Sequence, residues 1–169
     1  MISKTEYASY FEQYIKLVSK ENKSIIENLE ESQREFYSLL KSLPKEKHNY
    51  SYADGKWTLK ELIQHIIDTE RVFCYRALCF ARNDKTKLPG FDQDIFIDNV
   101  DANSRDFYDL LDEMETLRKS TIQLFKSFSD EALLRLGVAS NNKMSVRALG
   151  YLFSGHQIHH LNIIKERYI

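Results

Sequence analysis

Three of the five histidines lie close together in the segment GHQIHH, near the end of the printed sequence. If this segment is helical, His156 and His160 are one turn apart on one face, with Cβ atoms about 6 Å apart. Two imidazoles at this spacing can bind one metal ion. Both also occupy an apolar stripe where leucine would be expected, so we expect them to face the core. His159 lies at the flank of that stripe and is the weaker candidate.

A third ligand must come from another element, because two imidazoles on one helix make a poor metal site. His65 is the candidate, since it lies on the apolar face of a second predicted helix. Asp68, one turn further along, could orient its ring. Three neutral imidazoles leave positions open to water or substrate, as in catalytic sites. We therefore expect a divalent ion that acts as a Lewis acid or lowers the pKa of a bound water or thiol.

The alternative interpretation is a helical stress-response or binding module in which the buried histidines are structural. Residue 157 is Gln, so the pair is not the HExxH motif of zinc proteases, and the paired ExxH motifs of di-iron bundles are absent from the sequence. Arg71 and Arg76 could hold a substrate carboxylate. No acid or base is assigned; the candidates are His159, Asp68 and Asp92.

Hydrophobic periodicity predicts the elements that must position these side chains. Only 5 Gly and 2 Pro punctuate the chain, which favours a few long helices over a sheet. We expect four long helices, over about residues 22–43, 58–82, 104–128 and 145–167. Residues 5–18 read as a short helix or an irregular strap, and 83–103 and the GVASNNK segment as loops. The prediction is an all-α four-helix bundle with a crossover connection, in one domain over residues 1–169.

Composition limits the function classes. The 169 residues include 24 Lys and Arg and 25 Asp and Glu, so the net charge of −1 favours neither nucleic acid nor a membrane surface as a partner. No apolar run is long enough to span a bilayer, and the first residues lack the layout of a secretory signal. We therefore expect a cytoplasmic protein that acts on a small molecule. Cys74 and Cys79, five residues apart on one predicted helix, cannot form a disulfide.

Three segments together resemble the DinB/YfiT-like superfamily of metalloenzymes: GKWTLKELIQHIIDTERVFCYRAL, LPGFDQD and SVRALGYLFSGHQIHHLNIIKERY. The resemblance extends from about Tyr14 to Tyr168. It implies a four-helix bundle with a crossover and one divalent metal ion held by His65, His156 and His160. Three imidazoles do not specify the metal; zinc or nickel is favoured, with iron, cobalt or manganese as alternatives.

The resemblance also implies a range of activities. Relatives are labelled metal-dependent hydrolases, and some are thiol S-transferases that use bacillithiol, mycothiol or glutathione, or thiol-dependent isomerases. It therefore implies a low-molecular-weight thiol as cosubstrate, with hydrolysis as the nearest alternative reaction. Dimers are common among relatives, which makes a homodimer the expected assembly.

Overall fold

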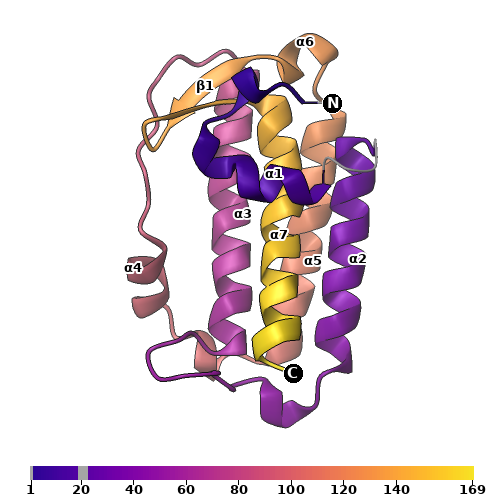
Figure 1. Ribbon diagram of the computed structural model, residues 1–169, viewed down its shortest axis with the longest axis vertical. Coiled ribbons are helices and arrows are strands. Elements are labelled where there is room, and N and C mark those ends of the chain that lie inside the picture. The colour runs from indigo at the N-terminus through magenta and orange to yellow at the C-terminus, as the bar shows by residue number, and fades with distance from the viewer. Residues whose placement is uncertain (1, 19–22) are drawn as a thin grey trace.

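The computed structural model describes residues 2–18 and 23–169 and is built around four long helices (Figure 1). They are α2 (Ile25–Ser42), α3 (Leu59–Ala81), α5 (Phe107–Lys126) and α7 (Val146–Arg167). Three shorter helices accompany them: α1 (Glu12–Val18), α4 (Gln93–Asp98) and α6 (Asp130–Leu133). The predicted four-helix bundle is confirmed. The expected start of the first helix, near Asn22, lies outside the described residues, and the described helix begins at Ile25.

Side-chain caps explain where the long helices begin. The Thr58 hydroxyl accepts a hydrogen bond from the backbone N–H of Glu61, and the Glu61 carboxylate accepts one from the backbone N–H of Thr58. This is the predicted capping box, in which two unsatisfied end donors are paired. Ser24 begins α2 in the same way, and the Ser145 hydroxyl caps α7. Local sequence therefore fixes the start of α3 and α7, the two helices that carry the histidine candidates.

The long helices run in two parallel pairs. Helices α3 and α5 run in one direction and α2 and α7 in the other (Figure 1). Each long helix packs against its parallel partner and against one helix of the other pair, α3 against α7 and α2 against α5. Because α3 and α5 are parallel, residues 82–106 must return along the length of the bundle, which is the predicted crossover. This connection is not the structureless loop that we expected, since it contains α4 and a short 3₁₀ turn at Ala102–Ser104.

The segment expected to be a polar loop before the last helix is instead a β-hairpin. Strand β1 (Leu136–Ala139) pairs antiparallel with β2 (Asn142–Ser145). The turn residues Ser140 and Asn141 have φ values of 50° and 60°, the left-handed conformation of tight hairpin turns. Asparagine tolerates this conformation without glycine, which is why the scarcity of glycine did not reveal the turn. The hairpin packs over the end of α3.

The N-terminal segment forms the predicted strap across the bundle. Two short 3₁₀ turns lead into α1, which crosses the outside of α7 (Figure 1). The crossing is close, because a Cβ atom at Gly155 would lie 2.2 Å from the carbonyl oxygen of Tyr14. Glycine is therefore needed where the strap meets α7. In the described part of the chain, no helix is both long and apolar enough to span a membrane.

Candidate metal centre

Helices α3 and α7 bring the three predicted histidines together in the middle of the bundle. The Nε2 atom of His156 lies 3.2 Å from Nε2 of His65 and 3.1 Å from Nε2 of His160. One ligand atom from each of the three rings lies within 4.8 Å of the others. Within residues 2–18 and 23–169, no carboxylate, thiol or further imidazole joins this group. The site therefore has three nitrogen donors and no fourth ligand from the described chain.

The donor arrangement fits a divalent ion better than it fits hydrogen bonding. An imidazole nitrogen has one in-plane lone pair or one N–H, so Nε2 of His156 cannot make good hydrogen bonds with both neighbours. A cation between the rings accepts a lone pair from each. Tetrahedral zinc, with Zn–N distances of about 2.0–2.1 Å, separates its nitrogen ligands by roughly 3.4 Å, which is close to the two spacings that involve His156.

Burial keeps these imidazoles in the form that binds metals. Desolvation lowers the pKa of His65 from its ordinary value of 6.5 to about 4. Desolvation also lowers the pKa values of His156 and His160 well below 6.5, and the proximity of the other imidazoles lowers them further. The three rings are therefore neutral near pH 7, with lone pairs available to a cation.

Neighbouring side chains fix the ring of His65. The indole of Trp57 packs on it, with ring centroids 4.8 Å apart, and the Thr69 hydroxyl lies 3.4 Å from its Nδ1. The prediction that Asp68 orients this ring is wrong. Asp68 instead accepts a hydrogen bond from Gln64 and pairs with Arg71. On an α-helix, the side chain at position i+4 points in a direction nearer to that of residue i than the side chain at i+3 does. Thr69 therefore lies beside the His65 ring, and Asp68 does not.

A cavity of about 620 Å³ opens beside the histidines and gives the site an accessible side. His65 and His156 contribute to its wall, and His156 is partly exposed. Asp92 also lines the cavity, although its carboxylate accepts hydrogen bonds from two backbone N–H groups at the start of α4. His159 lies outside the three-ring group, edge-on to Tyr14 at 5.2 Å, and is partly exposed. Of the acid–base candidates, Asp92 thus faces the cavity, whereas Asp68 and His159 do not line it.

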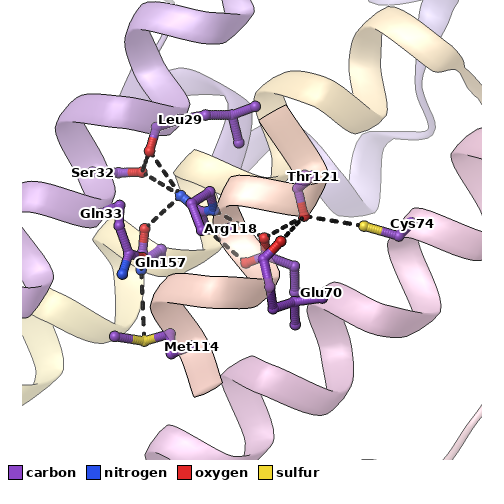
Figure 2. A network of polar contacts seen from close by, with 10 residues as sticks. Leu29, Ser32, Gln33, Glu70, Cys74, Met114, Arg118, Thr121 and Gln157 are labelled. Atoms are coloured by element: carbon purple, nitrogen blue, oxygen red, sulfur yellow. Dashed lines mark hydrogen bonds and ion pairs between the residues drawn. The ribbon is translucent and has the colours of Figure 1, made fainter. Parts of the chain in front are cut away.

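A buried polar network lies beside the site and was not predicted from the sequence (Figure 2). Arg118 on α5 donates from Nε and Nη2 to the two carboxylate oxygens of Glu70 on α3, at 2.9 and 2.8 Å. Its Nη1 donates to the carbonyl oxygen of Leu29 and the hydroxyl of Ser32, both on α2, and to Oε1 of Gln157 on α7. One side chain therefore links all four long helices.

This network fixes the two helices that carry the histidines. Glu70 is five residues after His65 on α3, and Gln157 directly follows His156 on α7. Gln157 also donates from Nε2 to Gln33. Because Glu70 and Gln157 bind the same guanidinium, α3 and α7 are held in register near the site, and the distance between their imidazoles is set with them. Charged residues on a helix are more often solvated, and only the three-dimensional pairing shows that these are buried.

The two cysteines are free, as expected. Burial raises the pKa of the Cys74 thiol to about 11, and its sulfur lies 3.2 Å from the Thr121 hydroxyl, at the edge of the polar network. Arg71, one of the two arginines considered for a substrate carboxylate, is paired with Glu113 and Asp68 on the outside of the bundle. Arg76, the other one, lines the cavity.

Comparisons with known proteins agree with this architecture. A curated protein of Oceanobacillus iheyensis, provisionally named as a metal-dependent hydrolase, is 27% identical over 126 residues, which is 73% of this chain and 72% of that protein. YfiT from Bacillus subtilis, described as a probable metal-dependent hydrolase with an unusual four-helix bundle topology, has a similar structure. Its TM-score is 0.74 at 19% identity, over 98% of this chain and 87% of YfiT.

A second solved structure, the DinB-like protein YjoA of Bacillus subtilis, matches with a TM-score of 0.60 at 19% identity. The match covers 85% of this chain and 89% of YjoA. The model of the DinB superfamily matches residues 28–164, which include most of the bundle and all three clustered histidines. The chain belongs to the DinB superfamily.

Proposed function

We propose that this protein is a metal-dependent enzyme that activates a small nucleophile at the three-histidine site. The observation that carries the proposal is the convergence of three neutral imidazoles, from His65, His156 and His160, beside an open cavity. A divalent ion bound by them supplies positive charge that lowers the pKa of a thiol or water ligand toward neutrality. Zinc or nickel is the proposed ion, and iron, cobalt and manganese fit the same donors.

The residues of the chain account for the rest of the proposed site. Burial holds the three imidazoles neutral, and Trp57 and Thr69 fix the orientation of His65. The cavity receives the small-molecule substrate next to His65 and His156. The proposed reaction is thiol S-transfer, in which a low-molecular-weight thiol attacks an electrophilic carbon. Asp92, at the cavity wall, is the better placed of the acid–base candidates.

Hydrolysis is the second candidate, and the names given to the relatives favour it. The Oceanobacillus protein and YfiT are both described as metal-dependent hydrolases. Water in place of the thiol gives that reaction at the same site. A non-catalytic module with structural histidines is less favoured, because a structural metal site is closed by a fourth protein ligand and this one adjoins a cavity. We also propose that the protein is located in the cytoplasm and forms a homodimer.

A paired assay tests the proposal. Protein reconstituted with Zn²⁺ or Ni²⁺ is mixed with bacillithiol, mycothiol or glutathione and monochlorobimane. Transfer forms an S–C bond, breaks the C–Cl bond and releases chloride and a proton. We expect turnover with at least one thiol, and its loss in His156→Ala but not in His48→Gln, because His48 stacks on Phe107 away from the site.

4-Nitrophenyl acetate without thiol tests hydrolysis in the same preparations. Metal-dependent turnover of the ester alone would select the hydrolase. If the metal-loaded protein turns over neither substrate class above the protein-free rate, the proposed activation is contradicted.

A further inference from the structure

The cavity extends from the histidines along one face of α3 to a buried arginine. Thr69, Phe73 and Arg76 follow His65 at helical spacing, and all of them line the cavity. Cζ of Arg76 is 5.8 Å from the centre of the Phe73 ring, which is 6.2 Å from the centre of the His156 ring. These two distances place the guanidinium within about 12 Å of the His156 ring. One small molecule can therefore contact both.

Arg76 is only 5% exposed, yet it has no acidic partner among the described residues. Its hydrogen bonds both come from Nη2, to the carbonyl oxygen of Pro89 at 3.1 Å and to the hydroxyl of Ser140 at 2.9 Å. The Phe73 and Phe91 rings flank the guanidinium. Within the described chain, Nε and Nη1 make no hydrogen bond. Arg118, the other deeply buried arginine, is instead neutralised by Glu70.

A buried guanidinium without a counter-charge is unfavourable, and two neutral acceptors do not compensate it. The nearest acids in the cavity wall do not supply the missing charge. Asp92 and Asp94 are exposed, and neither forms an ion pair with Arg76 in the described chain. The Asp92 carboxylate accepts from the backbone N–H groups of Asp94 and Ile95 at 2.9 and 3.3 Å. The counter-charge is therefore best supplied by a ligand.

We propose that Arg76 binds the carboxylate of a small organic acid in this cavity. The inference rests on the proposed function, whose substrate class it names. A guanidinium presents paired N–H donors that match a carboxylate. Phe73 lies between Arg76 and His156, and four further aromatic side chains line the cavity, which suits an aliphatic or aromatic body: Tyr10, Phe11, Tyr14 and Phe91. Asp92 and Asp94 also line the cavity, and their carboxylates would repel a second negative charge on the ligand. The ligand is a monocarboxylate whose other end reaches toward the histidines.

The first test uses metal-free protein, so that it does not depend on the proposed activity. Hexanoate and its neutral analogue hexan-1-ol are titrated, with binding followed by calorimetry and by the NMR signals of arginine Nε–Hε groups. We expect hexanoate to bind about tenfold more tightly, because hydrogen bonds between charged groups favour it. The Nε–Hε signal of Arg76 is identified by its absence from the spectrum of Arg76→Gln. We expect this signal to shift when hexanoate is added and to stay in place when hexan-1-ol is added.

Two variants separate binding from structure. Arg71→Gln is the matched control, because Arg71 lies on the same helix but pairs with Glu113 outside the cavity. It should keep the preference for hexanoate, and Arg76→Gln should lose it. Arg76→Lys keeps the charge but not the paired donors, and should show an intermediate preference with the loop at Pro89 still folded. Equal affinity for the acid and the alcohol in the wild type, or a preference that survives in Arg76→Gln, would overturn the proposal.

Metal-loaded protein shows which reactant carries the carboxylate. With Co²⁺ as the probe ion, 6-mercaptohexanoate is compared with 6-mercaptohexan-1-ol through the visible spectrum. Tighter binding of the acid, lost in Arg76→Gln, supports a carboxylate on the thiol. Arg76-dependent binding of hexanoate in the presence of saturating 6-mercaptohexan-1-ol supports a carboxylate on the second substrate. If no metal binds, the proposed function fails, whereas the metal-free titration still decides the role of Arg76.

Discussion

Replacing Arg118 with methionine should destabilise the bundle by several kilocalories per mole. The Arg118 and Glu70 side chains are 2% and 4% exposed, so Arg118→Met leaves a carboxylate buried beside little more than the Thr121 hydroxyl. Breaking a buried ion pair by removing one partner costs about 3–5 kcal/mol. The Leu29 carbonyl, the Ser32 hydroxyl and Gln157 Oε1 lose a donor as well. We therefore expect a loss of at least about 3 kcal/mol, out of a total stability of about 5–15 kcal/mol.

Urea denaturation of metal-free protein at pH 7, followed by circular dichroism, measures this loss. The double variant Arg118→Met with Glu70→Met removes both charges and should recover much of it, since apolar replacements of buried pairs are often neutral or stabilising. The control is Arg71→Met, which breaks half-exposed ion pairs and should cost no more than about 1 kcal/mol. If Arg118→Met costs less than about 1 kcal/mol, or the double variant recovers nothing, the network does not hold the helices as described.

Three further predictions concern the strap, a helix start and pH. Gly155→Ala should lower the free energy of unfolding by about 1–3 kcal/mol in urea denaturation, because the new Cβ meets the Tyr14 carbonyl and α1 must shift. An unchanged denaturation midpoint would count against the close crossing of α1 and α7. Thr58→Ala removes the cap of α3 and should lower the free energy of unfolding by about 1 kcal/mol in the same assay. An unchanged free energy of unfolding would show that the capping box is dispensable. In metal-free protein, unfolded His65 takes up a proton below pH 6.5, but folded His65 does so only near its lowered pKa of about 4. The stability that His65 contributes above pH 6.5 should therefore fall by up to about 3 kcal/mol between these pH values, and His156 and His160, whose pKa values are also lowered, should add to the fall. A flat profile would contradict the burial of these rings.

The long helices were predictable because local sequence determines them. Thr58 and Glu61 mark the start of α3, and the apolar stripe of α7 gave both its extent and the inward direction of His156 and His160. The convergence of these two residues with His65 was expected from their apolar faces, and the structure brings them together. The hairpin was missed because its turn uses Ser140 and Asn141 rather than glycine. The paired asparagines of NNK were the signal available for a left-handed turn.

The remaining parts of the site depend on contacts that are distant in sequence. Arg118 and Glu70 are 48 residues apart, and nothing in the pattern of either helix shows that they are buried together. The need for glycine at residue 155 arises only where α1 crosses α7. The sequence indicates that Arg76 could bind a substrate carboxylate, but an arginine on a helix is more often exposed to solvent. Only the structure shows its burial and its lack of an acidic partner in the described chain.

The binding of one divalent ion by His65, His156 and His160 is the central claim, and metal content tests it most directly. Protein purified without an affinity tag or a chelator is measured by elemental analysis, beside the three single His→Ala variants. His159→Ala is the matched control, since it lies on the same helix but outside the three-ring group. We predict about one ion per chain in the wild type and in His159→Ala, and its loss in each of the other three. Equal metal content in all five proteins, or none in the wild type after reconstitution, would contradict the proposed site.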